Sequence, residues 1–393
     1  MLDVWPALPL IIWRNGYFTG SMDNIIAGLQ CNDRVREIHL KNIQGSEIEV
    51  FLAEMQKPFP ELTHLDLYST DKVVPVDPDS FLGGFAPHLQ FLALHRLQFL
   101  GLPKLLLSTT HLVTLYLYDI PHSGYISPNA MVTVLSTLIS LERLSLGFHS
   151  PRSCPHWASR RPPPSTRSAL PILTLFWFKG VSEYLEDLVA CIDTPRLNDL
   201  AINFFNDIIF DMPQFVQFIN RTPTLGALEK AHIVFWEDHT NTKFLSQASD
   251  YRKFEVQVLC RGLHWQVSSL EQLCTSCLPS LVVLQDLYIY QFVADWKDSI
   301  EKSLWLELLH PFTAVKNLYL LKKLARLIAP ALPELVGGRM TVVLPALENI
   351  FLEGLESSGP VHEGIGQFVA ARQSTGHPIA ISSWTDSALV GMF

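Results

Sequence analysis

Residues 112–120, LVTLYLYDI, form the stretch that decides the fold of this 393-residue chain. Leu112, Leu115 and Leu117 follow one another at steps of three and two, and Ile120 comes three residues later. An amphipathic helix would need steps of three and four, whereas a half-buried strand would need steps of two throughout. The stretch therefore predicts a short strand that sends its leucines into a core and is entered through a tight bend.

The same pattern recurs along the chain and predicts leucine-rich repeats. Successive copies start 23 to 29 residues apart in the first half, within the 20–29 residues usual for such repeats. Helical spacing fills the gaps, as in Met131, Val134, Leu135 and Leu138. Strand and helix periods that alternate in this way predict parallel strands joined by right-handed helical crossovers. The copies start at Val35, Leu62, Leu89, Leu112, Leu141, Leu170 and Leu197, and again at Leu284, Val315 and Leu347.

We therefore expect an α/β leucine-rich-repeat solenoid: a single curved, right-handed domain over residues 1–393, with parallel strands on its concave face and helices on its convex face. Residues 1–34 should form the first strand–helix unit. Residues 151–169 carry five prolines and four arginines and should form a solvated loop. Residues 237–253 are polar and should form an irregular insertion, and residues 385–393 a frayed tail.

Composition excludes several classes of protein. The chain is 48% hydrophobic and 17% charged, far from the disordered class. A net charge of −9 disfavours nucleic acid and anionic lipid as partners. Six cysteines without framework spacing favour a reducing compartment, so we expect a cytoplasmic or nuclear protein. No stretch reaches the roughly 18 uncharged apolar residues that a membrane span requires.

Motifs for catalysis and for metal binding are weak in this sequence. Cys274 and Cys277 form a lone CxxC, and no second ligand pair follows at zinc spacing. With Leu270 and Leu273 they fall on one helical face, which predicts buried thiols that pack as small hydrophobes. The nucleophile-elbow, HExxH, Walker and GxGxxG patterns are absent. We therefore expect no enzyme, no cofactor and no metal.

The candidate binding residues are the side chains that the repeat turns to the concave face. In LxxLxLx the fourth and sixth positions point inward, so the fifth and seventh face outward. Aromatic residues are frequent there, and tyrosine and tryptophan dominate binding hot spots. The alternative is that these rings stack across strands and stiffen the sheet. The candidates are Tyr68, His95, Tyr116, Tyr118, Phe176, Trp177, Tyr288, Tyr290 and Tyr319.

Five stretches resemble the F-box/leucine-rich-repeat proteins of mushroom-forming fungi. They are WPALPLII (5–12), FKGVSEYLEDLVACIDTPRLNDLAINFFNDIIFDMPQFVQFINRTP (178–223), VQVLCRGLHWQVSSLEQLCTSCLP (256–279), WLELLHPFTAVKNLYL (305–320) and LPALENIFLEGL (344–355). In that family an F-box precedes the repeats and docks on the Skp adaptor of a ubiquitin ligase, while the repeats select the substrate. Only four residues precede WPALPLII, so the N-terminal F-box is missing here and a Skp adaptor is expected only if an F-box lies upstream.

The expected function is non-catalytic protein binding on the concave face, as the substrate-recognition repeats of an F-box type ubiquitin-ligase receptor. One alternative is a scaffold repeat protein with no ubiquitin role. The other is an enzyme with an unrecognised site near residues 237–253. No nucleic acid and no membrane is expected as a partner.

Overall fold

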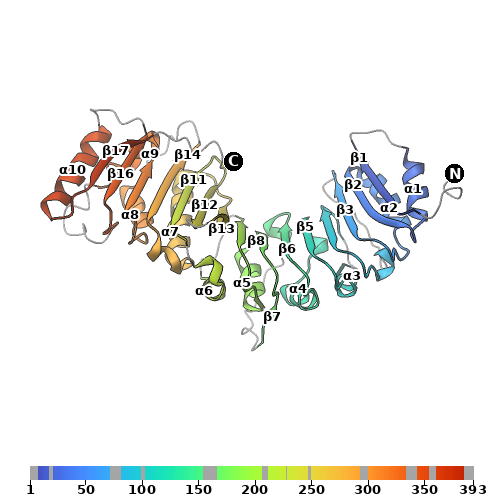
Figure 1. Ribbon diagram of the computed structural model, residues 1–393. Helices are drawn as coiled ribbons and strands as arrows, with labels where there is room; N and C mark the ends of the chain where they lie inside the picture. Colours follow the sequence, from blue (N-terminus) through green and yellow to red (C-terminus); the bar gives the residue numbers. More distant parts are fainter. Residues whose placement is uncertain are drawn as a thin grey trace. The chain divides into compact units, whose positions relative to one another are not determined.

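The computed structural model confirms the α/β leucine-rich-repeat fold (Figure 1). It describes residues 8–16, 21–70, 81–98, 102–153, 166–205, 211–226, 228–246, 249–292, 300–332, 343–353 and 360–384. The chain divides into two compact units, Met1–Asp199 and Leu200–Phe393. The single solenoid expected over residues 1–393 stays a prediction, and the predicted tail, 385–393, lies outside the described residues.

Unit 1 is built on a parallel sheet with the strand order β1-β2-β3-β4-β5-β6-β8. The strands are β1 (Leu10–Asn15), β2 (Val35–Ile43), β3 (His64–Ser69), β4 (Phe91–His95), β5 (Thr114–Ile120), β6 (Arg143–Phe148) and β8 (Leu175–Gly180). The helices are α1 (Met22–Gln30), α2 (Gly45–Glu54), α3 (Leu102–Ser108), α4 (Pro128–Leu135) and α5 (Ser182–Ala190). Three short 3-10 segments add to them: η2 (Phe81–Gly84), η3 (His122–Gly124) and η4 (Pro151–Ser153).

The leucine ladder forms the core of unit 1. Leu112, Leu115 and Leu117 are fully or almost fully buried, and their partners in the next strand are Leu144 and Leu146. Ser127 starts α4 by accepting a hydrogen bond from the backbone N–H of Ala130, which satisfies one of the free donors of the first turn. The helices lie along one side of the sheet (Figure 1). We call the opposite side, which no described helix covers, the strand face.

Unit 2 holds a sheet with the order β10-β13-β12-β11-β14-β15-β16-β17. Its β12–β13 hairpin is antiparallel, β12 also runs antiparallel to β11, and the pairs from β11–β14 to β16–β17 are parallel. Its strands are β10 (Asp199–Phe204), β11 (Lys230–Phe235), β12 (Thr240–Ser246), β13 (Ser249–Val258), β14 (Asp286–Gln291), β15 (Asn317–Leu320), β16 (Asn349–Glu353) and β17 (Ala380–Trp384). Its helices are α6 (Pro213–Arg221), α7 (Leu263–Ser276), α8 (Lys302–Leu309), α9 (Lys322–Ile328) and α10 (Pro360–Ser374), with 3-10 segments η5 (Pro223–Leu225) and η6 (Pro279–Val283).

The hairpin corrects two predictions. Residues 237–253 were expected to be irregular, yet most of them belong to β12 and β13. Strand β12 runs antiparallel to both β11 and β13, so the sheet is not parallel throughout. The reason lies in Thr240, Thr242 and Phe244, which alternate on the buried face. Two of these three residues carry a hydroxyl, which hides the strand period from a hydrophobicity pattern.

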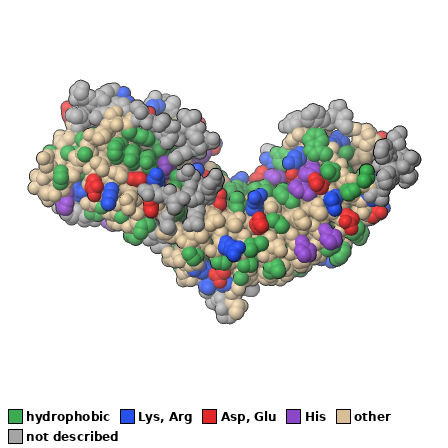
Figure 2. Space-filling model, viewed as in Figure 1, with side chains coloured by type: hydrophobic (Ala, Val, Ile, Leu, Met, Phe, Trp, Pro, Cys, Tyr) green, Lys and Arg blue, Asp and Glu red, His purple; other side chains and the backbone are tan. Residues whose placement is uncertain are grey.

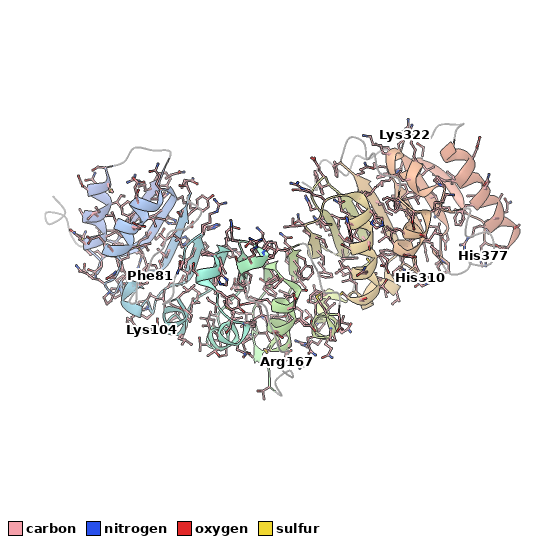
Figure 3. The ribbon with its side chains drawn as sticks, turned by 180° about the vertical axis from the view of Figure 1, so that it is seen from behind. Phe81, Lys104, Arg167, His310, Lys322 and His377 are labelled. Atoms are coloured by element: carbon pink, nitrogen blue, oxygen red, sulfur yellow. The ribbon has the colours of Figure 1, made fainter. Side chains whose placement is uncertain are left out.

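Part of the proline- and arginine-rich loop also pairs with other strands. Ser168–Ala169 (β7) runs parallel to Ile192–Asp193 (β9) in a small separate sheet. The guanidinium of Arg167 donates to the backbone oxygen of Ala190, and Figure 3 shows Arg167, like Lys104 of α3, on the helix side of unit 1. Residues 154–165 of this predicted loop lie outside the described residues.

Candidate functional site

The strand face of unit 1 gathers five of the predicted binding residues in one cluster. They come from β3, β4, β5 and β8, which are neighbours in the sheet apart from the intervening β6. Each is half-buried, so each ring both packs and keeps a surface open to solvent. We call this group the ring cluster: Tyr68, His95, Tyr116, Tyr118 and Trp177.

The rings of this cluster touch edge to face or at a tilt. Tyr68 and His95 meet at right angles with centroids 5.1 Å apart, and His95 lies 4.5 Å from Tyr118. Tyr118 in turn contacts Tyr116 at 5.6 Å and Trp177 at 5.2 Å. Tyr118 is therefore the centre of the cluster. Such ring pairs each add about 0.5–1.5 kcal/mol beyond the area that they bury.

A glycine allows Trp177 to reach the cluster. Strand β6 lies between β5 and β8, and a Cβ built on its Gly147 would lie 2.7 Å from the indole of Trp177. That separation is too short for any side chain. The missing side chain of Gly147 therefore makes the recess in which the indole packs on β6, where a larger residue would push it away.

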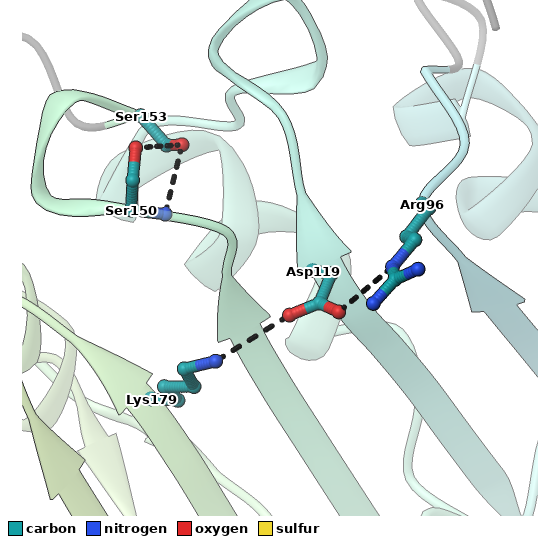
Figure 4. A network of polar contacts seen from close by, with 5 residues as sticks. All are labelled: Arg96, Asp119, Ser150, Ser153 and Lys179. Carbon is teal, nitrogen blue, oxygen red and sulfur yellow. Dashed lines mark hydrogen bonds and ion pairs between the residues drawn. The ribbon is translucent and has the colours of Figure 1, made fainter. Parts of the chain in front are cut away.

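Three charged side chains border the ring cluster (Figure 4). Asp119 accepts from the guanidinium of Arg96 at 3.2 Å and from the ammonium of Lys179 at 3.4 Å. Arg96 also lies 6.0 Å from the centre of the Tyr68 ring, within cation–π range. We call Arg96, Asp119 and Lys179 the charged border. Figure 2 shows basic, acidic and histidine side chains side by side on the face of unit 1 that it presents.

The charged border sits on unusual backbone. Arg96 and Asp119 have φ values of 57° and 52°, in the left-handed region that few residues other than glycine adopt. Asp119 falls where the pairing of β5 with β6 skips from Leu117 to Ile120. This β-bulge turns the end of the strand and aims the carboxylate of Asp119 along the sheet, between Arg96 and Lys179.

Burial shifts the pKa of two groups in the ring cluster. It lowers the pKa of His95, against the opposing effect of Asp66 and Asp119, so the neutral imidazole is favoured. It raises the pKa of Tyr118, against a hydrogen bond with Ser145. The phenol and the imidazole are therefore neutral hydrogen-bond partners beside a charged border, a combination suited to polar contacts with a protein surface.

Phe176 was predicted at the strand face, and the structure places it in the core instead. Its side chain is fully buried, and it pairs across the sheet with the core residue Leu144. The segment LPILTLFWF fits the repeat in two registers, and the one that starts at Leu173 is adopted. In that register Phe176 and Phe178 point inward, while Trp177 and Lys179 face outward.

The remaining predicted residues lie in unit 2 and form a stack. Tyr288 stacks on Tyr319 at 4.1 Å and on His232 at 4.4 Å, and Tyr319 stacks on Phe351 at 4.4 Å, all within 8° of parallel. Trp384 of β17 contacts Tyr288, Tyr290 and Tyr319. The prediction that Tyr290 is open to a partner is wrong, because only 2% of it is exposed.

The other chemical candidates behave as the sequence suggested. Cys274 and Cys277 are buried at the end of α7, and burial raises the pKa of Cys274, so its thiol stays protonated. Cys31, Cys191, Cys260, Cys274 and Cys277 are all free thiols.

None of the described helices combines the length and apolar character needed to cross a bilayer.

The sequence alone does not predict the charged border, because its members are far apart in the chain. Arg96 and Asp119 directly follow outward-facing residues of their strands, but the repeat pattern gives no reason to pair them with Lys179. His64 and Phe91, which lie four residues before the candidates Tyr68 and His95, were missed as well. They stack at 3.9 Å because both also face outward at the start of their strands.

Comparison with known proteins shows a distant likeness to solved structures. No protein-family model matches the chain. No curated protein matches it. Among solved structures it is similar to the leucine-rich-repeat-containing protein LegL7 from Legionella pneumophila, with 13% sequence identity, 92% of this chain and 96% of that chain covered, and a TM-score of 0.32. The strands, helices and buried leucines of the chain itself make its fold that of an α/β leucine-rich-repeat solenoid.

Proposed function

We propose that this chain is a non-catalytic protein-binding module and that the ring cluster of unit 1, with its charged border, is the binding surface. The observation that carries the proposal is the half-exposed contact between Tyr118 and Trp177 next to Arg96, Asp119 and Lys179. Rigid rings supply contact area at low entropic cost, and the flanking charges select for a complementary partner.

The side of the unit 2 sheet that carries the stacked rings, which we call the strand face of unit 2, is a weaker candidate for the same role. Its rings lie parallel to one another under Trp384, and Tyr290 is closed off. Tyr288, Tyr319 and Phe351 are half-buried like the ring cluster, but their faces are covered by their neighbours in the stack, so a partner would meet mainly their edges. This supports the interpretation of the unit 2 rings as cross-strand packing and of the unit 1 rings as the contact surface.

The test compares a double variant with a matched control. Tyr118→Ser with Trp177→Ser removes the centre of the ring cluster, whereas Trp265→Ser removes a tryptophan of α7 that is 65% exposed outside the strand face. Proteins cross-linked to the full chain in cells would be identified by mass spectrometry, and the binding of each purified candidate measured by calorimetry. The double variant should lose about 2 kcal/mol or more, roughly 30-fold in Kd, and the control should not.

Two results would contradict the proposal. One is a partner that binds the double variant as tightly as the unchanged chain. The other is a cross-link map in which the partner contacts fall on the helices of unit 1. Circular dichroism of each variant separates a loss of binding from a loss of fold.

The finer proposal is that the partner is a substrate of a cytoplasmic or nuclear ubiquitin ligase of the F-box type. Its support is the resemblance of residues 5–12, 178–223, 256–279, 305–320 and 344–355 to F-box/leucine-rich-repeat proteins of mushroom-forming fungi. Co-purification of a Skp adaptor with a longer form that carries an F-box, together with partner ubiquitination that depends on Trp177, would support it. A partner whose ubiquitination is unchanged by Trp177→Ser would favour the scaffold alternative.

A further inference from the structure

A second cluster on the strand face of unit 1 lies outside the ring cluster. His39 on β2 and His64 and Asp66 on β3 place one ligand atom each within 4.8 Å of one another. His39 pairs directly with Asp66 across the two strands, and His64 lies two residues before Asp66 on the same face. Adjacent strands of a sheet are about 4.8 Å apart, so this register itself brings the three side chains together.

Neighbouring groups hold the three side chains in place. The ring of His64 stacks on Phe91 with centroids 3.9 Å apart and planes 3° from parallel. The carboxylate of Glu37 lies 3.0 Å from Nε2 of His39. A carboxylate that contacts a histidine orients its ring for metal binding in many protein sites. Asp66 is buried to 8% exposure, so its carboxylate has few positions to adopt.

The chemistry of the three groups fits a borderline-soft divalent cation. Two imidazoles and one carboxylate are a ligand set of zinc sites that keep an open coordination position. Zinc ligands stand about 3.3 Å apart in a tetrahedral shell, so small side-chain rotations would close the present spacing.

One neighbour competes with a cation for this site. The ammonium of Lys41 lies 2.8 Å from a carboxylate oxygen of Asp66. Nearly half of the Lys41 side chain is exposed, so it can leave Asp66 for solvent at little cost. Lys41 therefore occupies the position in which a metal would bind the carboxylate.

From this arrangement we propose that His39, His64 and Asp66 form a zinc-binding site on the strand face of unit 1, with Lys41 as its displaceable counter-ion. The three ligands come from two neighbouring strands of a rigid sheet, and the site needs no change of backbone. It stands independently of the proposed protein-binding function.

The experiment is Zn²⁺ titration of the purified, chelator-treated full chain by calorimetry. His64→Phe keeps a ring on Phe91 and Asp66→Asn keeps the shape of the carboxylate, yet each removes one ligand. Each should lower the Zn²⁺ affinity at least about tenfold. His310→Phe is the matched control, because His310 is an exposed histidine at the end of α8 in unit 2, and it should leave the affinity unchanged.

A fourth variant protects the test against misfolding. Lys41→Met removes the competing charge and should raise the Zn²⁺ affinity several-fold, a gain that a damaged fold cannot produce. The proposal is overturned if the unchanged chain binds Zn²⁺ no better than the His64→Phe variant, if His310→Phe weakens binding as much as His64→Phe does, or if Lys41→Met weakens it.

Discussion

The strand faces of the two units carry aromatic residues at the same repeat positions and use them differently. In unit 1 the rings meet edge to face or at a tilt, so that parts of their faces stay open, and they border Arg96, Asp119 and Lys179. In unit 2, His232, Tyr288, Tyr319 and Phe351 form a nearly parallel stack across four strands. The repeat position thus determines where a ring is attached to its strand. The neighbouring side chains determine whether that ring packs against other rings of the sheet or stays open to a partner.

The largest expected effect is on the free energy of unfolding, and it compares the buried ring of Tyr290 with the half-exposed ring of Tyr118. Tyr290→Ala should cost about 3–5 kcal/mol of unfolding free energy, because it empties a buried site. Tyr118→Ala should cost less than about 2 kcal/mol, since that ring is half-exposed. Urea unfolding followed by circular dichroism measures both, and Tyr290→Phe is the conservative control. A larger loss for Tyr118→Ala than for Tyr290→Ala would reverse the comparison.

The second prediction uses pH to probe the unit 2 stack. Burial, with smaller contributions from Lys243 and Lys230, lowers the pKa of His232 from 6.5 to about 4. As the pH falls below 6.5 the unfolded chain takes up this proton first, so stability is lost between pH 6.5 and about 4. The 2.5-unit difference between these values corresponds to a loss of about 3 kcal/mol at most.

Replacing the histidine tests that assignment. His232→Phe keeps a ring against Tyr288 and removes the titrating group, so unfolding measured across this pH range should show a shallower loss of stability. His95→Phe in unit 1 is the comparison variant, with a smaller change expected because His95 is more exposed. An unchanged pH slope in His232→Phe would show that other groups control acid sensitivity.

The third prediction concerns an amide ladder in unit 2. Asn349 donates to Asn317 at 2.8 Å, and Asn317 donates to Asp286 at 2.7 Å, which links the first residues of β14, β15 and β16. Asn317→Ala breaks both bonds and should cost about 1–2 kcal/mol, whereas Asn349→Ala breaks one and should cost about half as much. Thermal unfolding would rank the two, and equal losses would show that the bond from Asn317 to Asp286 adds no stability beyond that of the bond from Asn349 to Asn317.

The smallest expected effect is in the charged border of unit 1. Asp119→Asn removes both ion pairs but suits the positive φ, because asparagine adopts the left-handed region readily. The loss of stability should stay below about 1 kcal/mol and should shrink further between about 0.1 M and 1 M salt, where exposed charges are screened. A salt-independent loss would show that Asp119 acts through the backbone rather than through its charge.

The repeat pattern could be predicted from the sequence because it depends on local spacing. Leu112, Leu115 and Leu117 are buried as expected, and Cys274 and Cys277 lie on the buried side of α7. The register at Phe176 could not be predicted, since LPILTLFWF satisfies the repeat in two ways and packing against Leu144 chooses between them.

Contacts between distant repeats could not be predicted from local sequence patterns. Trp384 of β17 covers Tyr290 of β14, and nothing in the sequence of either strand indicates this contact. The ion pairs of Asp119 join three repeats in the same way. The cluster of His39, His64 and Asp66 depends on the register between β2 and β3. The spacing of the leucines indicates that register, but the pairing of the two strands determines it.

The hairpin of unit 2 has a consequence for how the chain could change over time. Because β11 and β13 each run antiparallel to β12, they point in the same direction. A two-strand insertion of this kind preserves the direction of every repeat that follows it, so whole repeats on either side could be gained or lost by gene duplication without reversing the next strand. A single inserted strand would have left its successor facing the wrong way.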